Sequence, residues 1–170
     1  MRILQENKWH AVYVSSRQEK TACRILTEKG ITAYLPLVKT LRQWSDRKKT
    51  VMMPLLNGYL FVFAKPFEFL DILQTKGIVN FVKSEGKVAV IREEEMESLR
   101  RVVDLDYQLE VRVLEQGYRE GEQVKITSGI LKGVEGYVLE KREGKFIDVM
   151  LGSIGQSIRV KLPEHVLTLV

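Results

Sequence analysis

The spacing of glycines in the last third of the chain limits the possible folds most strongly. From residue 121 onward, short apolar runs alternate with glycines that favour tight turns. This pattern predicts five strands, at Gln123–Thr127, Gly136–Lys141, Phe146–Leu151, Gln156–Leu162 and Val166–Leu169. Glycines inside a helix would each cost up to about 1 kcal/mol. Residues 121–170 are therefore predicted to form a small SH3-like β-barrel that does not convert into helices.

The preceding part alternates strand and helix patterns, which indicates an α+β domain over residues 1–103. We expect strands at Trp9–Val14, Thr32–Val38, Val51–Leu55, Gly58–Ala64, Ile78–Lys83 and Lys87–Ile91. We expect one helix from a capping box of Ser16 and Glu19 to a stop at Gly30, and a second from Pro66 to about Gln74. We expect a third over Glu93–Val103, with Met96, Leu99 and Val103 buried. Residues 40–50 are polar and basic and predict a hairpin arm, whereas residues 104–120 are acidic and predict a linker.

Charge is distributed unevenly between these two parts. Residues 1–103 contain 18 Lys and Arg against 11 Asp and Glu, whereas residues 104–170 contain 9 against 11. Basic charge confined to one part favours a polyanionic partner for that part. The alternative is a solvated face that carries basic residues without a partner.

The cysteine and histidine residues of the chain are too few and too far apart in sequence to form a disulfide, a metal site or a catalytic site. Cys23 stands alone, so no internal disulfide can form, which indicates a reducing, cytoplasmic environment. His10 and His165 lie far apart in sequence without nearby clusters of Cys, Asp or Glu. We therefore expect no metal, no cofactor, no catalytic residues and no enzyme activity. No apolar run approaches the roughly 20 residues that span a bilayer.

Residues 57–64, Asn-Gly-Tyr-Leu-Phe-Val-Phe-Ala, predict a strand that carries three rings. The pattern is similar to the base-stacking strand of RNA-recognition domains, but Leu60 and Ala64 occupy the positions of a small residue and a ring. A core strand with its rings packed on a helix is the alternative. This segment alone does not decide between the two.

The segment Gly121–Gly136 resembles the KOW motif, which occurs in some ribosomal proteins and in the NusG family. Its turns correspond to Gly129, Gly133 and Gly136. The first part of the chain resembles the NusG N-terminal domain in Trp9, in Tyr34-Leu35-Pro36, in the residues from Pro54 to Val62 and in Thr75-Lys76-Gly77-Ile78. Residues 41–49, Leu-Arg-Gln-Trp-Ser-Asp-Arg-Lys-Lys, are similar to specialised paralogues, particularly UpxY-type antiterminators, with RfaH more distant.

This resemblance covers about residues 8–169 and implies both a fold and a function. The fold would be an N-terminal α/β sandwich with an antiparallel sheet (residues 1–103), a linker (104–120) and a KOW barrel (121–170). The function would be that of a monomeric transcription factor that binds the RNA polymerase clamp and suppresses pausing and termination at particular operons, such as capsule or polysaccharide operons. The alternatives are a general housekeeping NusG and an RNA- or ribosome-binding module.

The resemblance also implies contact residues on the N-terminal part and a partner for the barrel. The clamp of RNA polymerase would contact Tyr13, Leu56, Tyr59 and Phe61. The non-template DNA strand, or a leader nucleic acid, would contact Arg17, Lys20, Arg24, Arg42, Trp44, Arg47, Lys48, Lys49, Thr75 and Lys76. The barrel would recruit a small-subunit ribosomal protein or the termination factor Rho.

Overall fold

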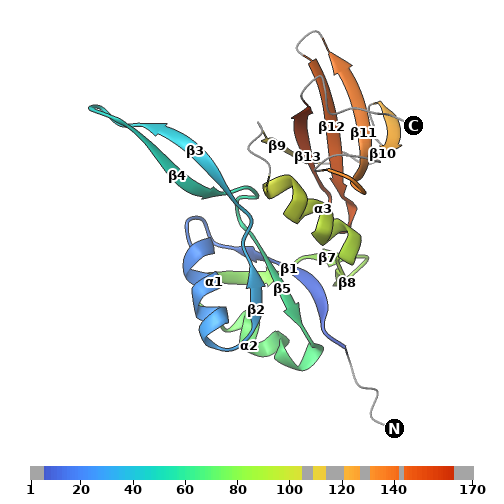
Figure 1. The fold of residues 1–170 in the computed structure, drawn as a ribbon. Coiled ribbons are helices and arrows are strands. Elements are labelled where there is room, and N and C mark those ends of the chain that lie inside the picture. Colours follow the sequence, from blue (N-terminus) through green and yellow to red (C-terminus); the bar gives the residue numbers. More distant parts are fainter. Residues whose placement is uncertain (1–5, 105–108, 114–120, 127–130, 142–143, 163–170) are drawn as a thin grey trace. The chain divides into compact units, whose positions relative to one another are not determined.

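The computed structural model describes residues 6–104, 109–113, 121–126, 131–141 and 144–162. The chain forms two compact units, residues 1–91 and residues 92–170. Both units are built on antiparallel sheets, so the predicted α+β class is confirmed. Figure 1 labels the elements of each unit.

A four-stranded antiparallel sheet with the order β2-β5-β1-β6 forms the centre of the first unit. Its strands are β1 (Lys8–Val14), β2 (Thr32–Tyr34), β5 (Tyr59–Ala64) and β6 (Ile78–Phe81). The helices of this unit are α1 (Glu19–Glu28), η1 (Pro66–Glu68) and α2 (Phe69–Leu73). The strand and helix positions thus follow the sequence pattern closely, with Pro66 opening the short helix as predicted.

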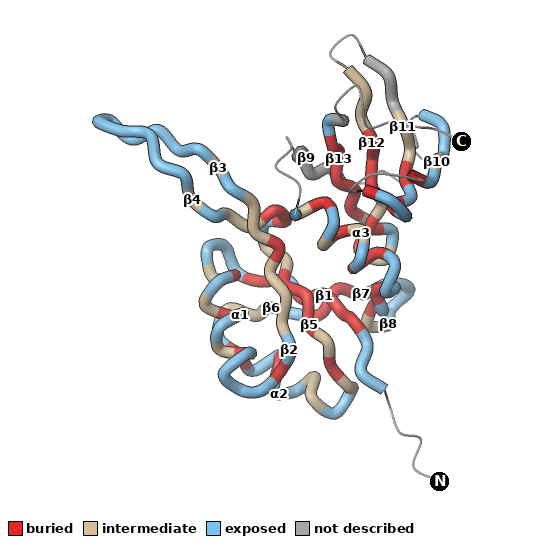
Figure 2. The backbone as a smooth tube through the Cα atoms, in the orientation of Figure 1, coloured by how far each residue is buried: buried red, intermediate tan, exposed pale blue. Residues whose placement is uncertain are grey.

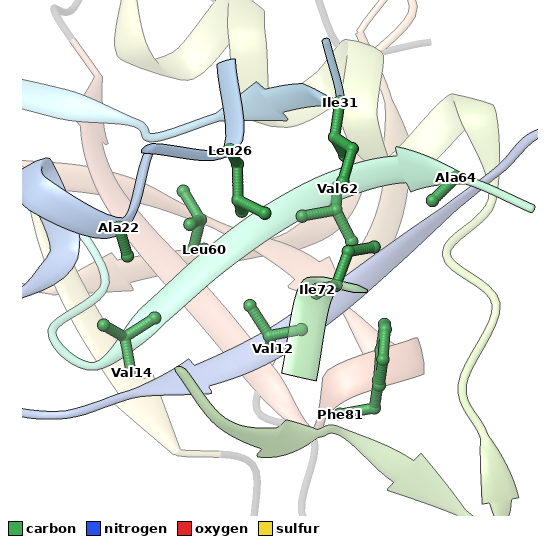
Figure 3. Packing of buried hydrophobic residues seen from close by; sticks show 10 residues of the cluster. All are labelled: Val12, Val14, Ala22, Leu26, Ile31, Leu60, Val62, Ala64, Ile72 and Phe81. Carbon is green, nitrogen blue, oxygen red and sulfur yellow. The ribbon is translucent and has the colours of Figure 1, made fainter. Parts of the chain in front are cut away.

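One face of this sheet packs against α1 and α2. The cluster contains Val12, Val14, Ala22, Leu26, Ile31, Leu60, Val62, Ala64, Ile72 and Phe81 (Figure 3). Side chains alternate between the two faces of a strand. The rings of Tyr59, Phe61 and Phe63 therefore lie on the opposite face, and the alternative in which they pack on a helix is wrong for α1 and α2.

Helix α1 ends as the sequence predicts but begins differently. At its end, the Ile31 amide donates to the Leu26 carbonyl at 3.0 Å and Gly30 has a φ of 79°, which together form a Schellman motif. At its start, the N-cap is Gln18 and no side chain caps the helix. The predicted capping box of Ser16 and Glu19 is therefore wrong, because the Glu19 carboxylate accepts a hydrogen bond from a distant segment instead.

Two hairpins complete the first unit. The predicted arm consists of β3 (Leu37–Gln43) and β4 (Lys48–Pro54), closed by a hydrogen bond from the Trp44 amide to the Arg47 carbonyl at 2.8 Å. The strand expected over residues 32–38 is divided by Pro36, which has no amide hydrogen to continue a ladder. The second hairpin, β7 (Lys83–Ser84) and β8 (Lys87–Val88), turns at Glu85 and Gly86, which both have positive φ.

His10 on β1 is a buried titratable group of this unit, with 4% of its surface exposed. Its Nδ1–H donates to the Ala89 carbonyl at 2.8 Å, and its ring packs edge-on against Phe69 and Phe81. Burial lowers the pKa of His10 below its ordinary value of 6.5, and the hydrogen bond to Ala89 offsets this only in part. The imidazole is therefore neutral in the folded unit.

The stability of residues 1–91 is expected to fall as the pH drops below about 6.5, because the unfolded chain then binds a proton that buried His10 does not. The slope should approach about 1.4 kcal/mol per pH unit until the lowered pKa is reached. Urea unfolding can be followed by tryptophan fluorescence, since Trp9 and Trp44 are the two tryptophans of the chain and both lie in this unit. His10→Phe should flatten this dependence, and an unchanged slope in that variant would refute the assignment.

The second unit is a five-stranded antiparallel sheet of order β10-β11-β12-β13-β9 with one helix. Its elements are α3 (Glu93–Val103), β9 (Leu109–Val113), β10 (Glu122–Lys125), β11 (Glu135–Lys141), β12 (Gly144–Leu151), η2 (Gly152–Ile154) and β13 (Gln156–Leu162). This sheet is consistent with the predicted SH3-like KOW domain, and no described residue of 123–162 is in an α-helix. The strand expected at residues 166–169 lies outside the described residues.

Strand β9 was not predicted, and helix α3 differs from its prediction in its buried stripe and in the unit to which it belongs. β9 lies inside the segment expected to be a linker, where it pairs with β13 through Leu109 opposite Val160 and Val113 opposite Gln156. Helix α3 spans the predicted residues, but its buried apolar stripe is Met96, Leu99 and Val102 rather than Val103. The division between the units falls after residue 91, so α3 groups with the C-terminal sheet rather than with residues 1–91.

Glu95 ties α3 to the sheet of its own unit. Its carboxylate accepts hydrogen bonds from the Ser153 amide at 3.1 Å, from the Ser153 hydroxyl and from the Arg92 amide. Burial raises the pKa of Glu95, but these hydrogen bonds outweigh burial and hold the pKa below its ordinary value. The carboxylate therefore stays ionised and holds η2 against the helix.

A buried ion pair joins two neighbouring inner strands of this sheet. Asp148 on β12 lies directly opposite Arg159 on β13. The Arg159 guanidinium donates from Nε to Oδ1 and from Nη2 to Oδ2, both at 2.6 Å. Both side chains are largely buried: 13% of the Asp148 side-chain surface and 6% of the Arg159 side-chain surface are exposed. The pair is thus bidentate, which is the strongest geometry for a carboxylate and a guanidinium.

Candidate functional site

Two tyrosines form an accessible ring pair on the sheet face opposite α1 and α2. Tyr13 on β1 lies directly opposite Tyr59 on β5, and their ring centroids are 5.4 Å apart. Tyr13 is 40% exposed and Tyr59 is half-buried. Aromatic side chains of this kind anchor protein partners well, because they bury a large area at a small cost in conformational entropy. The structure thus brings together two of the four predicted clamp contacts at an accessible position.

Leu56 and Phe61 do not fit their predicted role as direct contacts. They are 1% and 0% exposed, whereas a contact residue needs accessible surface. Phe61 lies opposite Ala11 in the sheet, and its ring centroid is 6.4 Å from that of Tyr34. The Leu56 carbonyl accepts a hydrogen bond from the Tyr59 amide at 3.3 Å. These two residues therefore support the ring pair from within the fold.

The turn that precedes Tyr59 is fixed by a buried carboxylate. Gly58 has a φ of 77°, and its amide donates to Oε1 of Glu19 at 2.9 Å. The Gly58 carbonyl accepts from the Val14 amide, also at 2.9 Å. Sequence reasoning missed this role of Glu19, although the spacing of residues 19, 22 and 26 places Glu19 on the same helix face as the buried Ala22 and Leu26. A carboxylate on a buried helical stripe was the available signal.

The arm, residues 37–54, carries five of the ten predicted nucleic-acid contacts. It contains five basic residues and one acidic residue, and every residue from 41 to 50 is exposed (Figure 2). Arg42 and Lys49 lie directly opposite each other, a like-charge pairing that destabilises a hairpin by itself. Among the described residues, no carboxylate forms a salt bridge with any basic residue of the arm. Trp44, at the end of the arm, is 56% exposed.

The three predicted contacts on and just before helix α1 lie in different environments. Arg17 precedes the helix with a φ of 65° and is exposed. Lys20 is exposed as well, but its ammonium donates to the Met52 carbonyl of β4 at 2.7 Å. Arg24 forms an exposed salt bridge with Glu28 at 2.6 Å. The hydrogen bond of Lys20 brings the basic side of α1 next to the arm, which the sequence did not predict.

The two remaining predicted contacts differ in accessibility. Thr75 is 3% exposed, and its hydroxyl donates to the Asp71 carbonyl and accepts from the Lys29 ammonium, both at 2.9 Å. Thr75 therefore has a structural role and does not fit a direct contact with nucleic acid. Lys76 is exposed and remains available for such a contact.

The three glycines assigned to the KOW turns have separate roles. Gly133 has a φ of 87° and its amide donates to the Ile126 carbonyl at 2.7 Å, as expected for a tight turn. Gly136 is a strand residue of β11 and not a turn residue. A Cβ there would meet the Asp148 carbonyl oxygen of the neighbouring strand at a distance that no real contact allows. Gly129 lies outside the described residues.

Other kinds of site receive no support from the described parts of the chain. No group of three or more His, Cys, Asp or Glu residues is placed there to hold a metal ion. Among the helices that the structure describes, none is long and apolar enough to cross a membrane. Burial raises the pKa of Cys23 above its ordinary value, which disfavours the reactive thiolate.

Comparison with known proteins agrees with these features. A family model described as transcription termination factor nusG matches residues 7–100, more than half of the chain. The transcription termination/antitermination protein NusG of Thermus thermophilus is 28% identical over 176 residues, which cover 91% of this chain and 94% of that protein. A solved structure concerned with domain interaction in Thermotoga maritima NusG has a TM-score of 0.52 at 22% identity, over 92% of this chain and 93% of the other, and supports the fold. The chain therefore belongs to the NusG family of transcription factors.

Proposed function

We propose that this protein is a non-enzymatic transcription elongation and antitermination factor that binds RNA polymerase through the Tyr13–Tyr59 ring pair. The accessible ring pair carries this proposal, since it lies within the residues that match the family model. Two rings that pack against each other at a tilt on one face of a sheet form a preorganised anchor for an apolar or helical surface. Leu56 and Phe61 contribute by holding the strand and turn that present the rings.

The proposed effect on transcription is a shift in the populations of polymerase states. A factor that binds the closed, processive clamp more tightly than the open clamp increases the fraction of closed polymerase. Pausing and termination, which need the open state, then become less frequent. Binding energy alone supplies this effect, so no catalytic residue is required.

The basic arm favours a specialised factor over a general one. Arg42, Arg47, Lys48 and Lys49 would contact phosphates, and the exposed ring of Trp44 would stack on a base. The unfavourable pairing of Arg42 with Lys49 is relieved when a polyanion binds. We therefore assign the arm to a nucleic-acid strand exposed at particular operons. The C-terminal unit would recruit a second protein, such as a ribosomal protein or Rho.

Binding and pausing assays with bacterial RNA polymerase test the proposed function. The full chain should bind core polymerase in the absence of nucleic acid and should shorten pauses in promoter-initiated transcription. A general factor would act equally on all templates, whereas a specialised factor would act only downstream of its own leader sequence. Absence of binding by a folded chain would overturn the proposal and would favour an RNA- or ribosome-binding module.

Replacing Arg42 and Lys49 together with glutamine is expected to reduce the salt dependence of nucleic-acid binding. For a single strand, losing two phosphate contacts should lower the slope of log K against log salt by about 1.4. The measurement is fluorescence anisotropy of a labelled oligonucleotide over a series of salt concentrations.

The β7–β8 hairpin provides a matched control for the arm. Lys83→Gln with Lys87→Gln removes the same charge from two exposed residues of another hairpin in this unit. The slope should stay unchanged in this control. Equal changes in the two double variants would show that net charge, rather than the arm, determines binding.

A further inference from the structure

Two consecutive side chains in the first turn of α1 contact two separate segments of the first unit. The Lys20 ammonium donates to the Met52 carbonyl of β4 at 2.7 Å. The Glu19 carboxylate accepts from the Gly58 amide, immediately before Tyr59, at 2.9 Å. One helical turn is thus hydrogen-bonded both to the arm and to the turn that carries the ring pair.

The arm needs a support of this kind because of its topology. β3 and β4 form a two-stranded sheet of their own, separate from the four-stranded sheet. Isolated two-stranded hairpins are marginally stable in water, and their direction is not fixed by neighbouring strands. At the base of the arm, the Leu55 amide donates to the Pro36 carbonyl at 2.8 Å, which closes the ribbon without aligning it to α1. The Lys20 bond supplies that alignment.

Glu19 connects α1 to the turn that carries the ring pair. It is 5% exposed, and a carboxylate is retained in such a place only when hydrogen bonds compensate for its lost hydration. Its acceptor oxygen satisfies the amide of Gly58, a residue held at positive φ. Because β4 reaches β5 through this turn, the position of the turn also affects the base of the arm.

We propose that Glu19 and Lys20 are positioning residues that fix the direction of the arm relative to the Tyr13–Tyr59 ring pair. A nucleic-acid strand on the arm is then held at a set distance from the protein bound by the rings. The inference rests on the proposed function, which assigns a binding role to each of these two surfaces. Neither residue is required to touch a partner.

Distances between two spin labels test this inference without any partner. One label is placed at the end of the arm through Ser45→Cys, and the other after α2 through Gln74→Cys, in a full-length chain with Cys23→Ala. Both labelled positions are exposed. The parent protein should give one narrow distance distribution by pulsed electron paramagnetic resonance. Lys20→Met should make the distribution about twofold wider, because the base of the arm is released.

Matched variants distinguish the hydrogen bonds of Lys20 and Glu19 from general effects of charge and helix stability. Arg24→Met removes a positive charge from the same helix, where Arg24 forms a salt bridge with Glu28 within α1, and should leave the distribution narrow. Glu19→Ala should widen the distribution, and Glu19→Gln should restore it, since the amide oxygen still accepts from Gly58. Tryptophan fluorescence confirms that each variant is folded.

Each outcome has one meaning. A broad distribution in the parent, or equal widths for Lys20→Met and Arg24→Met, would overturn the positioning role. A narrow parent distribution that widens in Lys20→Met and Glu19→Ala would support the positioning role even if the protein failed to bind polymerase. In that case the proposed function would be wrong and the connection between α1 and the arm would stand.

Discussion

Replacing Asp148 with alanine is expected to destabilise residues 92–170 by about 3–5 kcal/mol. The substitution leaves the buried Arg159 guanidinium without the carboxylate that accepts two hydrogen bonds of 2.6 Å. Small domains unfold with only about 5–15 kcal/mol in total, so this loss brings the sheet close to unfolding. Hydrogen exchange of peptides from β12 and β13 should report the change, since both tryptophans lie in the other unit.

An exposed pair in the same sheet provides the control for this prediction. Lys125 and Glu135 also lie directly opposite each other and are 2.9 Å apart, but both are largely exposed. Glu135→Ala should therefore cost far less stability than Asp148→Ala, because solvent screens an exposed ion pair. If Asp148→Ala cost no more than Glu135→Ala, the buried pair would not stabilise the sheet. The double variant Asp148→Leu with Arg159→Met should recover most of the loss, because no buried charge remains.

Tyr59→Ala is expected to weaken binding to core RNA polymerase about thirtyfold or more, the effect of removing an aromatic hot spot worth roughly 2 kcal/mol. Tyr13→Ala should weaken binding as well. The double variant should lose less than the sum of the single losses, because each ring packs against the other. The measurement is a titration of labelled full-length protein with polymerase that carries no nucleic acid.

Two further variants show which property of Tyr59 is used. Tyr59→Phe keeps the ring and should bind nearly as well as the parent. Trp44→Ala removes another exposed ring from the same unit and should leave binding to polymerase without nucleic acid unchanged. A similar loss for Trp44→Ala and Tyr59→Ala would show that the ring pair is not the specific contact.

The sequence predicted those elements whose signals are local. A short apolar run placed β1, and a run of aromatic and β-branched residues placed β5. Pro66 and Gly30 marked helix termini, and the polar run from residue 40 to 50 indicated the arm. β9 was missed because its alternation, Leu-Glu-Val-Arg-Val, is only five residues long and follows an acidic stretch. Its pairing partner β13 lies more than forty residues further along the chain.

Burial and long-range hydrogen bonds explain the remaining differences at the candidate site. Alternation shows that Tyr59 and Phe61 share a face, but it does not show that only Tyr59 is accessible. Ser16 and Glu19 have the spacing of a capping box, yet Glu19 instead bonds to Gly58, which lies 39 residues away. Thr75 was assigned by position, and its burial follows from contacts with α1 and α2.

The hydrogen bonds of Glu95 with Ser153 determine where this chain can be recombined with a relative. The family model ends at residue 100, within α3, so a hybrid designed from sequence would be joined near that position. Such a hybrid would combine Glu95 from one parent with the η2 segment of the other, and a residue without a hydroxyl at position 153 would remove the donor that the Ser153 hydroxyl supplies to the buried carboxylate. A junction after residue 91 keeps the helix and the sheet from the same parent. Exchange of C-terminal domains among such factors is therefore expected to succeed when the helix is inherited together with the sheet.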